Sequence, residues 1–250
     1  MRNKLILTVL AALALTGATA FAQDSDKNVK FSAAVTLGAS NYASVSAMSG
    51  QLPSYSVEAP SANWIDNDLG LGLEAGMQIG NSWRIVLGGT FGYGITPGRS
   101  ALPGTADPNA SPEDNWGEIP NYEAVPGEKA LSWYAYTGFD YLFSIEAIPA
   151  LRPHVGFRVG GNYASSQKDG RETFAVGNSV AESYGVRTAV TAGVDYDLSK
   201  NLFLGISINA LEYSYDVVKH KPQEGLSVLG AAAHNIGFAA HPVFKIGVRF

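Results

Sequence analysis

The chain has 250 residues, a formal net charge of −5 and no cysteine, and only 16% of its residues are charged. The acidic balance excludes the basic surface that nucleic-acid binding needs, and the lack of cysteine excludes disulfides and thiolate metal sites. The charged fraction is below the usual value of about 25%, while 28 glycines, 12 tyrosines and 11 phenylalanines are present. Because no later apolar run is long enough for a transmembrane helix, this composition favours a membrane β-protein.

Residues 1–22 have the three parts of a signal peptide. Arg2 and Lys4 precede an apolar run from Leu5 to Leu15, and small residues follow as far as Ala22. A basic segment, a short apolar segment and a small-residue site are the features of a cleaved export signal. We therefore expect cleavage after Ala22 and a single exported domain formed by residues 23–250.

Eight later segments show the alternation of a β-strand, in which residues i, i+2 and i+4 share one face. In one of them, Leu73 and Met77 alternate with Glu74 and Gln78. Each segment has about the 9 to 11 residues that a tilted transmembrane strand needs, or more. In chain order the segments are 29–37, 69–79, 83–95, 131–143, 153–163, 184–196, 202–210 and 236–250.

The connections between these segments alternate in length. Three are short, namely 80–82, 144–152 and 197–201, and four are long, namely 46–67, 96–129, 165–182 and 216–234. Short periplasmic turns and longer external loops are typical of outer-membrane barrels. The sequence therefore predicts an all-β fold, an eight-stranded antiparallel transmembrane up-and-down β-barrel whose termini both lie on the periplasmic side.

A soluble sandwich or a lipocalin-like barrel would also show short alternating strands. Its solvent face would be rich in Lys and Glu, whereas the polar face here consists mostly of Gly, Ser, Thr and Asn with isolated charges. In lipid, only a closed sheet satisfies every backbone group. These two points favour the membrane barrel.

The last seven residues, FKIGVRF, alternate up to the final residue. This alternation predicts that Phe244, Ile246, Val248 and Phe250 face lipid, with the last phenylalanine at the periplasmic rim, where aromatic side chains are favoured. Such an ending resembles the assembly signal of outer-membrane barrels.

The pattern as a whole resembles the small eight-stranded barrels of the OmpA and OmpX kind, often described as outer-membrane β-barrel or porin-family proteins. The resemblance implies residence in the Gram-negative outer membrane, contact with outer-membrane lipid, and assembly by the barrel assembly machinery and periplasmic chaperones. We expect no peptidoglycan-binding domain after the barrel.

An eight-stranded barrel has an interior that side chains roughly fill. We therefore expect the inward charges to form an ion-pair network that plugs the lumen, with Glu74 held by Arg158, Arg187 or both. A gated solute pathway is the alternative interpretation of the same residues. The predicted network comprises Lys30, Glu74, Arg84, Asp140, Arg158, Arg187, Asp195, Lys245 and Arg249.

A search for catalytic and metal-binding patterns finds none. The lipid deacylase barrels carry a His-x-Ser pair, but none of the four histidines here, His154, His220, His234 and His241, is followed by Ser two residues on. The segment from Asp195 to Ser199 lacks the glycine and the final glutamate of a calcium loop. We expect no enzyme activity, no metal and no cofactor.

The longest connection, 96–129, is rich in Pro, Gly and acidic residues. It is either a solvated loop or a surface that binds cations or a partner, with Trp116 and Tyr122 as anchors. Three functions stay open from the sequence: a structural or surface-interaction barrel, which the filled lumen favours, a narrow channel for small solutes, and a lipid-modifying enzyme. The sequence does not identify an extracellular ligand.

Overall fold

A computed structural model of the protein describes residues 29–39, 69–100, 124–169, 177–221 and 224–250. No helix within these ranges has both the length and the apolar character to cross a membrane. The described chain is organised into eight strands: β1 (Val29–Ala39), β2 (Leu69–Ile79), β3 (Trp83–Thr96), β4 (Glu128–Leu142), β5 (Leu151–Lys168), β6 (Ser179–Asp197), β7 (Leu202–Lys221) and β8 (Leu229–Arg249).

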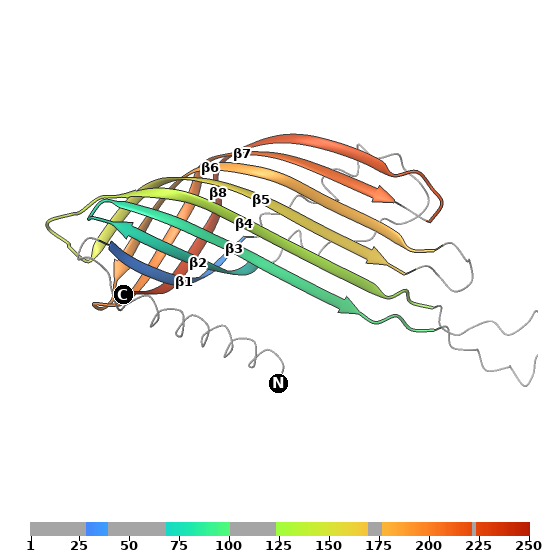
Figure 1. The fold of residues 1–250 in the computed structure, drawn as a ribbon, viewed down its shortest axis with the longest axis horizontal. Coiled ribbons are helices and arrows are strands. Elements are labelled where there is room, and N and C mark those ends of the chain that lie inside the picture. Colours follow the sequence, from blue (N-terminus) through green and yellow to red (C-terminus); the bar gives the residue numbers. More distant parts are fainter. Residues whose placement is uncertain (1–28, 40–68, 101–123, 170–176, 222–223) are drawn as a thin grey trace, which may run out of the picture.

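The strands form one closed barrel (Figure 1). Each strand pairs antiparallel with its neighbours in the chain, and β1 also pairs with β8, from Ser32 opposite Arg249 to Gly38 opposite Val243. Beyond this ladder, the backbones of Phe31 and Phe250 exchange two hydrogen bonds of 2.9 and 3.0 Å. The predicted eight-stranded antiparallel barrel is confirmed.

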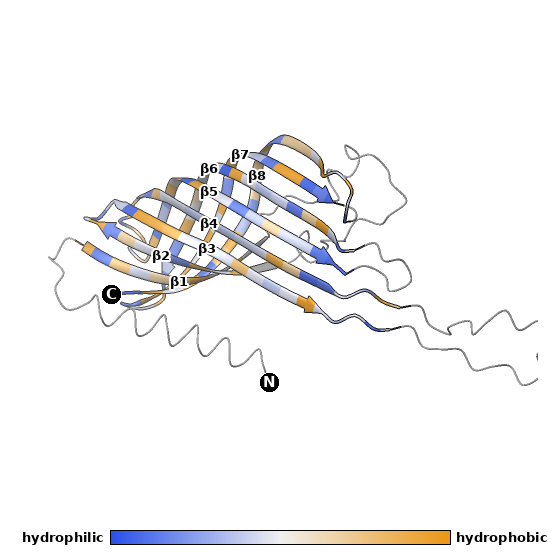
Figure 2. Cartoon of the chain, turned by 45° about the vertical axis from the view of Figure 1, so that its right-hand side comes forward, coloured by the Kyte–Doolittle hydropathy of each residue, from blue (hydrophilic) through white to orange (hydrophobic). Residues whose placement is uncertain are grey.

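The apolar side chains of the strands point outward, and the polar ones point into the lumen. Leu87 and Phe91 are 62% and 71% exposed, whereas Arg84 is 3% exposed. Figure 2 shows the resulting alternation of hydrophobic and hydrophilic residues along individual strands. An outward apolar face is the arrangement that a lipid environment requires.

The short connections 80–82, 143–150 and 198–201 and the residue Phe250 lie at one end of the barrel, on the left of Figure 1. We call it the short-turn end and the opposite end the loop end. Gly80 has a φ of 63° in the tight β2–β3 turn, a conformation that suits glycine. The predicted alternation of short and long connections holds clearly for the long connections 40–68 and 97–127, but not for the last one, since 222–228 is shorter than 143–150.

Two predicted loops are shorter than expected. Strands β5 to β8 have 18, 19, 20 and 21 residues, so parts of the predicted loops 165–182 and 216–234 are strand. Ser165 pairs with Glu182 in the β5–β6 ladder, and Glu182 accepts a 2.9 Å hydrogen bond from Tyr163. The sequence prediction was wrong here because these strand ends lack the alternation of large apolar and polar residues: β5 ends in SSQK, and β8 begins with LGAAA.

Aromatic residues mark both ends of the lipid-facing surface. Near the short-turn end, Trp83 packs edge-on against Tyr141 with ring centroids 5.2 Å apart. Toward the loop end, Trp133 stacks on Tyr163 at 6.4 Å, and the ammonium group of Lys219 lies 5.3 Å from the centre of the Tyr184 ring. Two such girdles are typical of transmembrane barrels.

A bulge interrupts the β7–β8 ladder between Ser207 and Asn209. On the facing strand, Ala239 and His241 have φ values of 49° and 51°, which are uncommon for residues other than glycine. Bulges bend a strand and redirect its side chains. Here the imidazole of His241 lies beside the inward carboxylate of Glu212, with 2.9 Å between His241 Nδ1 and Glu212 Oε2.

Candidate functional site

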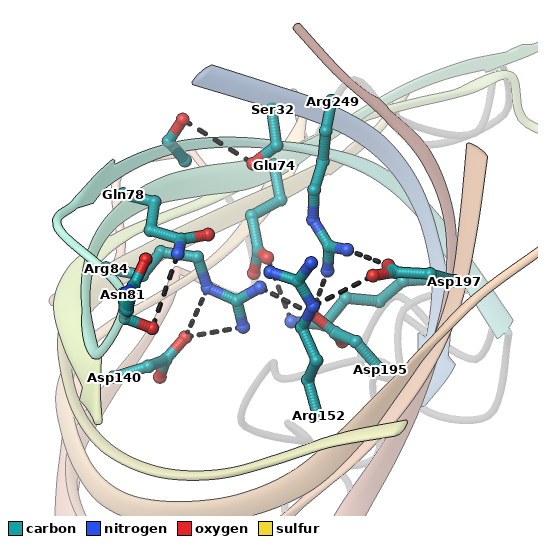
Figure 3. A network of polar contacts seen from close by, with 12 residues as sticks. Ser32, Glu74, Gln78, Asn81, Arg84, Asp140, Arg152, Asp195, Asp197 and Arg249 are labelled. Atoms are coloured by element: carbon teal, nitrogen blue, oxygen red, sulfur yellow. Dashed lines mark hydrogen bonds and ion pairs between the residues drawn. The ribbon is translucent and has the colours of Figure 1, made fainter. Parts of the chain in front are cut away.

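Buried ion pairs cross the lumen near the short-turn end. The guanidinium of Arg84 on β3 lies 2.7 Å from the Asp140 carboxylate on β4 and 2.5 Å from that of Asp195 on β6 (Figure 3). Both aspartates are 0% exposed. Because β3 and β6 are not neighbours in the barrel, the contact between Arg84 and Asp195 bridges the interior.

The ion pairs continue to the rim of the barrel. Arg249 on β8 donates to two aspartates of β6, to Asp195 at 3.0 Å and also to Asp197. Arg152 on β5 pairs with Asp197 at 2.8 Å (Figure 3), and the side chains of these two residues are 28% and 18% exposed. The network is therefore dry in its interior and partly hydrated at its edge.

Arg158 on β5 completes the network. Its Nη1 atom lies 2.6 Å from Asp140 and donates at 3.2 Å to the carbonyl oxygens of Phe139 and Phe157. A buried charge is costly unless it is paired and hydrogen-bonded, so these contacts act as a unit. We call this unit the plug; it consists of Arg84, Asp140, Arg152, Arg158, Asp195, Asp197 and Arg249.

Glu74 belongs to a separate buried pair. Its Oε1 atom lies 2.8 Å from Lys245 Nζ, and its Oε2 atom accepts a 2.7 Å hydrogen bond from Tyr136. The prediction that Arg158 or Arg187 holds Glu74 is therefore wrong. Closure of the barrel between β1 and β8 brings Lys245 near Glu74, since β8 is then separated from β2 only by β1.

Arg187 forms a third group with Glu212. Its Nη1 lies 3.2 Å from Glu212 Oε1, and its Nη2 lies 3.9 Å from Asp216. Glu212 also accepts a bond from Asn209 and contacts His241. This group lies nearer the loop end than the plug does, because Arg187 is eight positions along β6 from Asp195.

Lys30 is not part of these groups. It lies opposite Gln78 near the start of β1, its side chain is exposed, and it forms no ion pair with any described residue. Its assignment to the network was wrong because inward orientation alone does not bury a residue at the barrel rim. The other eight predicted charges are buried and ion-paired.

Glycines provide the room that the buried charges occupy. A Cβ atom added to Gly205 would lie 2.6 Å from Asp195 Oδ1, and one added to Gly193 would lie 2.6 Å from His154 Nε2. Alternation of small and large inward residues is how a narrow barrel fits its interior. This accounts for part of the high glycine content.

A small cavity of about 50 Å³ lies between the Glu74 pair and the Arg187 group. Its wall includes both glutamates, three basic residues and the ring of His241. One water molecule needs roughly 10–15 Å³ of such space, so the cavity has room for a few water molecules. The residues that line it are Glu74, Tyr134, Tyr136, Arg158, Arg187, Ala189, Thr191, Ser207, Asn209, Glu212, His241, Val243 and Lys245.

Sequence reasoning missed several members of these groups, chiefly Arg152, Asp197, Glu212 and Asp216. Asp197 shares a face with Asp195 by the i+2 rule, so the alternation of β6 could have identified it. Glu212 could not be found in this way, because the bulge at Ala210 in the β6–β7 ladder shifts the inward positions of β7 from odd to even numbers.

The end of β8 has the predicted outward orientation at two positions. Phe244 and Ile246 are 55% and 52% exposed, whereas Val248 and Phe250 are only partly exposed. The Phe250 ring stacks on that of Phe31 with centroids 6.4 Å apart. The role of these residues in assembly stays a prediction.

The histidines and the two loop anchors are the remaining candidate residues. Within the described residues, no three His, Cys, Asp or Glu side chains are grouped as metal ligands. His154 and His220 are buried in the lumen. The predicted anchors Trp116 and Tyr122 lie outside the described residues.

Several solved structures resemble this chain at low sequence identity. The chain is 12% identical to a major outer membrane protein from Thermus thermophilus, with a TM-score of 0.46, covering 89% of this chain and 99% of that one. It is 14% identical to OprG from Pseudomonas aeruginosa, with a TM-score of 0.39 and coverage of 89% and 96%. It is 11% identical to Ail from Yersinia pestis, in a complex with the heparin analogue sucrose octasulfate, with a TM-score of 0.38 and coverage of 89% and 98%.

Comparison with protein families gives a direct assignment. No match was found among curated proteins. The model of the "Putative OmpA-OmpF-like porin family" matches residues 57–250, which include seven of the eight strands. The chain is therefore a member of this family and an outer-membrane β-barrel protein.

Proposed function

We propose that this protein is a closed outer-membrane barrel that acts through the surface at its loop end and does not conduct solutes. The observation that carries the proposal is the position of Arg84, which bridges Asp140 and Asp195 from two different walls of the lumen. Both carboxylates are fully buried, so a solute passing this level would have to separate charges in a dry interior.

The length of the strands supports a role for the loop end. A tilted strand crosses the membrane with about 9 to 11 residues, whereas β7 and β8 have 20 and 21. The residues of β7 and β8 beyond this length lie toward the loop end, where they lead into the connection between the two strands. We propose Trp116 and Tyr122, within the long acidic connection, as anchors for an external partner.

Conductance of the purified barrel in planar lipid bilayers tests the closed lumen. We expect wild-type protein to give no steady single-channel current. We expect Arg84→Ala to give current, because it removes the group that joins β3 to β6, while Arg99→Ala at the exposed loop end should stay silent. Steady conductance in the wild-type protein would contradict the proposal.

A narrow channel for small solutes is the second candidate. Two observations favour it: the Arg152–Asp197 pair is partly exposed, and a cavity lies on the loop-end side of the plug, so the lumen is not filled along its whole length. Under this alternative, wild-type protein conducts at low level and substitution of Arg152 changes its ion selectivity.

The surface role has its own test. Vesicles carrying the wild-type barrel should bind to immobilised polycations or to a protein partner more strongly than vesicles carrying Trp116→Ala and Tyr122→Ala together. Equal binding by the two would remove these residues as anchors while leaving the closed lumen unaffected.

A further inference from the structure

The outward face of the barrel carries a patch of polar and aromatic side chains toward the loop end. The patch lies on three neighbouring strands, β6, β7 and β8 (Figure 1). It continues the aromatic girdle formed by Trp133 and Tyr163, because Tyr163 pairs directly with Tyr184 on β6. We call it the girdle patch; its exposed members are Tyr184, Tyr213, Tyr215, Lys219 and His234.

Lys219 is the cation of the girdle patch. Its ammonium group lies 5.3 Å from the centre of the Tyr184 ring, and it forms no ion pair with any described residue. Glu182 lies opposite Lys219 in the β6–β7 ladder, but its carboxylate accepts the hydrogen bond from Tyr163 on the other side. An aromatic face orients an ammonium group without neutralising it, so the charge of Lys219 is available to an anion.

The outward charge around Lys219 is positive. Lys221 lies two positions further along β7 and therefore shares its face. Among the described outward residues in the loop-end halves of β6, β7 and β8, these two lysines are opposed by one carboxylate, that of Glu182. Aromatic girdles lie at the level of the lipid headgroups, so the nearest external anions are lipid phosphates.

His234 adds a directional hydrogen-bond donor to the girdle patch. The Tyr213 hydroxyl lies 2.8 Å from His234 Nδ1, and the imidazole ring lies 4.7 Å from the Tyr215 ring, centroid to centroid. A phenol is a better donor than a neutral imidazole, so Tyr213 donates to Nδ1 and the imidazole carries its own proton on Nε2. Nε2 has no partner among the described residues, and its N–H group is available to a ligand on the outward face.

The girdle patch is larger than one phosphate group. Neighbouring strands lie about 4.8 Å apart, so Tyr184 on β6 and His234 on β8 are separated by about 10 Å. The six residues from Tyr213 to Lys219 extend over about 20 Å of β7. A single phosphate reaches only the Lys219 corner, whereas a phosphorylated sugar headgroup also reaches the histidine and the tyrosines.

We propose that the girdle patch binds the phosphorylated disaccharide headgroup of a glycolipid of the lipid A type in the outer leaflet. Lys219 contacts a phosphate, and His234 Nε2 donates to a sugar oxygen. The assignment to the outer leaflet rests on the proposed orientation, with the loop end outside the cell. Affinities measured in micelles do not depend on that orientation, nor on whether the lumen conducts.

Native mass spectrometry of the full barrel, released from detergent micelles, tests the proposal with three probes. These are lipid A with two phosphates, the same lipid A without phosphates, and phosphatidylglycerol. We expect lipid A to bind roughly tenfold more tightly than its dephosphorylated form, which is the effect of one charge-assisted hydrogen bond. Lipid A should also bind more tightly than phosphatidylglycerol, which has the phosphate but lacks the sugars.

Substitutions at Lys219 and Glu182 test the role of the charge. Lys219→Gln should weaken the binding of lipid A by roughly tenfold and leave that of the dephosphorylated form unchanged. Lys200→Gln, at an exposed position in the β6–β7 turn of the short-turn end, is the matched control and should bind lipid A as wild type does. Glu182→Gln removes the opposing carboxylate and should tighten lipid A binding, so it decides the outcome if Lys219→Gln fails to fold.

His234→Phe tests the contact with the sugar. It keeps an aromatic ring and removes the Nε2 donor, so it should weaken the binding of both forms of lipid A and leave that of phosphatidylglycerol unchanged. Equal affinity of wild type for lipid A and its dephosphorylated form would overturn the proposal. Equal affinity for lipid A and phosphatidylglycerol would overturn the assignment to a glycolipid, and equal losses in Lys200→Gln and Lys219→Gln would overturn the assignment to the girdle patch.

Discussion

Lys245 and Tyr136 both bond to the carboxylate of Glu74 inside the lumen. Glu74→Ala should lower the free energy of unfolding by roughly 3 kcal/mol or more, because it leaves the Lys245 charge buried and unpaired. Glu74→Gln should cost less, since its amide oxygen still accepts one hydrogen bond. Denaturant unfolding of the barrel in detergent micelles measures both changes.

The matched control for Glu74 is Glu146→Gln, at an exposed position in the β4–β5 connection. This substitution should leave the unfolding transition within about 0.5 kcal/mol of wild type. Loss of stability in Glu146→Gln equal to that in Glu74→Ala would mean that net charge, and not the pair with Lys245, determines stability.

Gly205 gives a second prediction at the scale of single residues. Gly205→Ala should displace Asp195 and weaken its pairs with Arg84 and Arg249, because the new methyl group would overlap the carboxylate. We expect a lower unfolding temperature. Gly94→Ala is the control, since no atom lies within 4 Å of its added Cβ; equal behaviour of the two variants would show that Asp195 moves aside without cost.

At the scale of elements, the positions of the strands could be predicted but not all their ends. Residues 69–79 and the start at Trp83 were predicted as the structure has them. Lipid contact imposes apolar residues at every second position there, which makes the period visible. Outside the membrane, apolar residues are no longer required at every second position. Accordingly, β7 continues to Lys221 with charged residues such as Lys219 on its outward face.

The partners within the ion pairs could not be predicted from the sequence. Alternation predicted that Arg84 and Asp195 point inward, but not that they touch. Contacts across a lumen depend on how far each strand is staggered against the next, and only pairing shows this stagger. The wrong partners for Glu74 arose from comparing positions along the strands without knowing this stagger.

The end of β8 carries a prediction about assembly. Deletion of Phe250, or Phe250→Lys, should reduce the amount of folded, heat-modifiable protein in the membrane far more than it reduces the stability of barrels refolded in detergent. The reason is the proposed recognition of this residue by the assembly machinery. Phe250→Trp, which keeps an aromatic side chain, is the control.

Equal amounts of folded membrane protein for the deletion variant and for wild type would contradict the role of Phe250 in assembly. Phe250 would then matter only through its stacking on Phe31 and its backbone bonds to that residue. In that case the refolded barrel, and not the cellular yield, should show the defect.

For the whole molecule, the prediction concerns orientation. The chain contains no cysteine, so single cysteines report their positions without background. An impermeant maleimide added to intact cells should label Leu226→Cys at the loop end and leave Asn81→Cys in the β2–β3 turn unlabelled until the outer membrane is opened. The reverse pattern would contradict the proposed topology.

The seam between β1 and β8 has a kinetic consequence. It joins residues about two hundred positions apart, such as Ser32 and Arg249, whereas every other ladder joins consecutive strands. Its register covers only the seven pairs from Ser32–Arg249 to Gly38–Val243. Contacts between distant residues form slowly, because the chain between them must first be ordered. We therefore expect the seven hairpin-type ladders to form before the seam and closure of the seam to limit the rate of folding, so that weakening the seam slows maturation more than equal weakening of any hairpin.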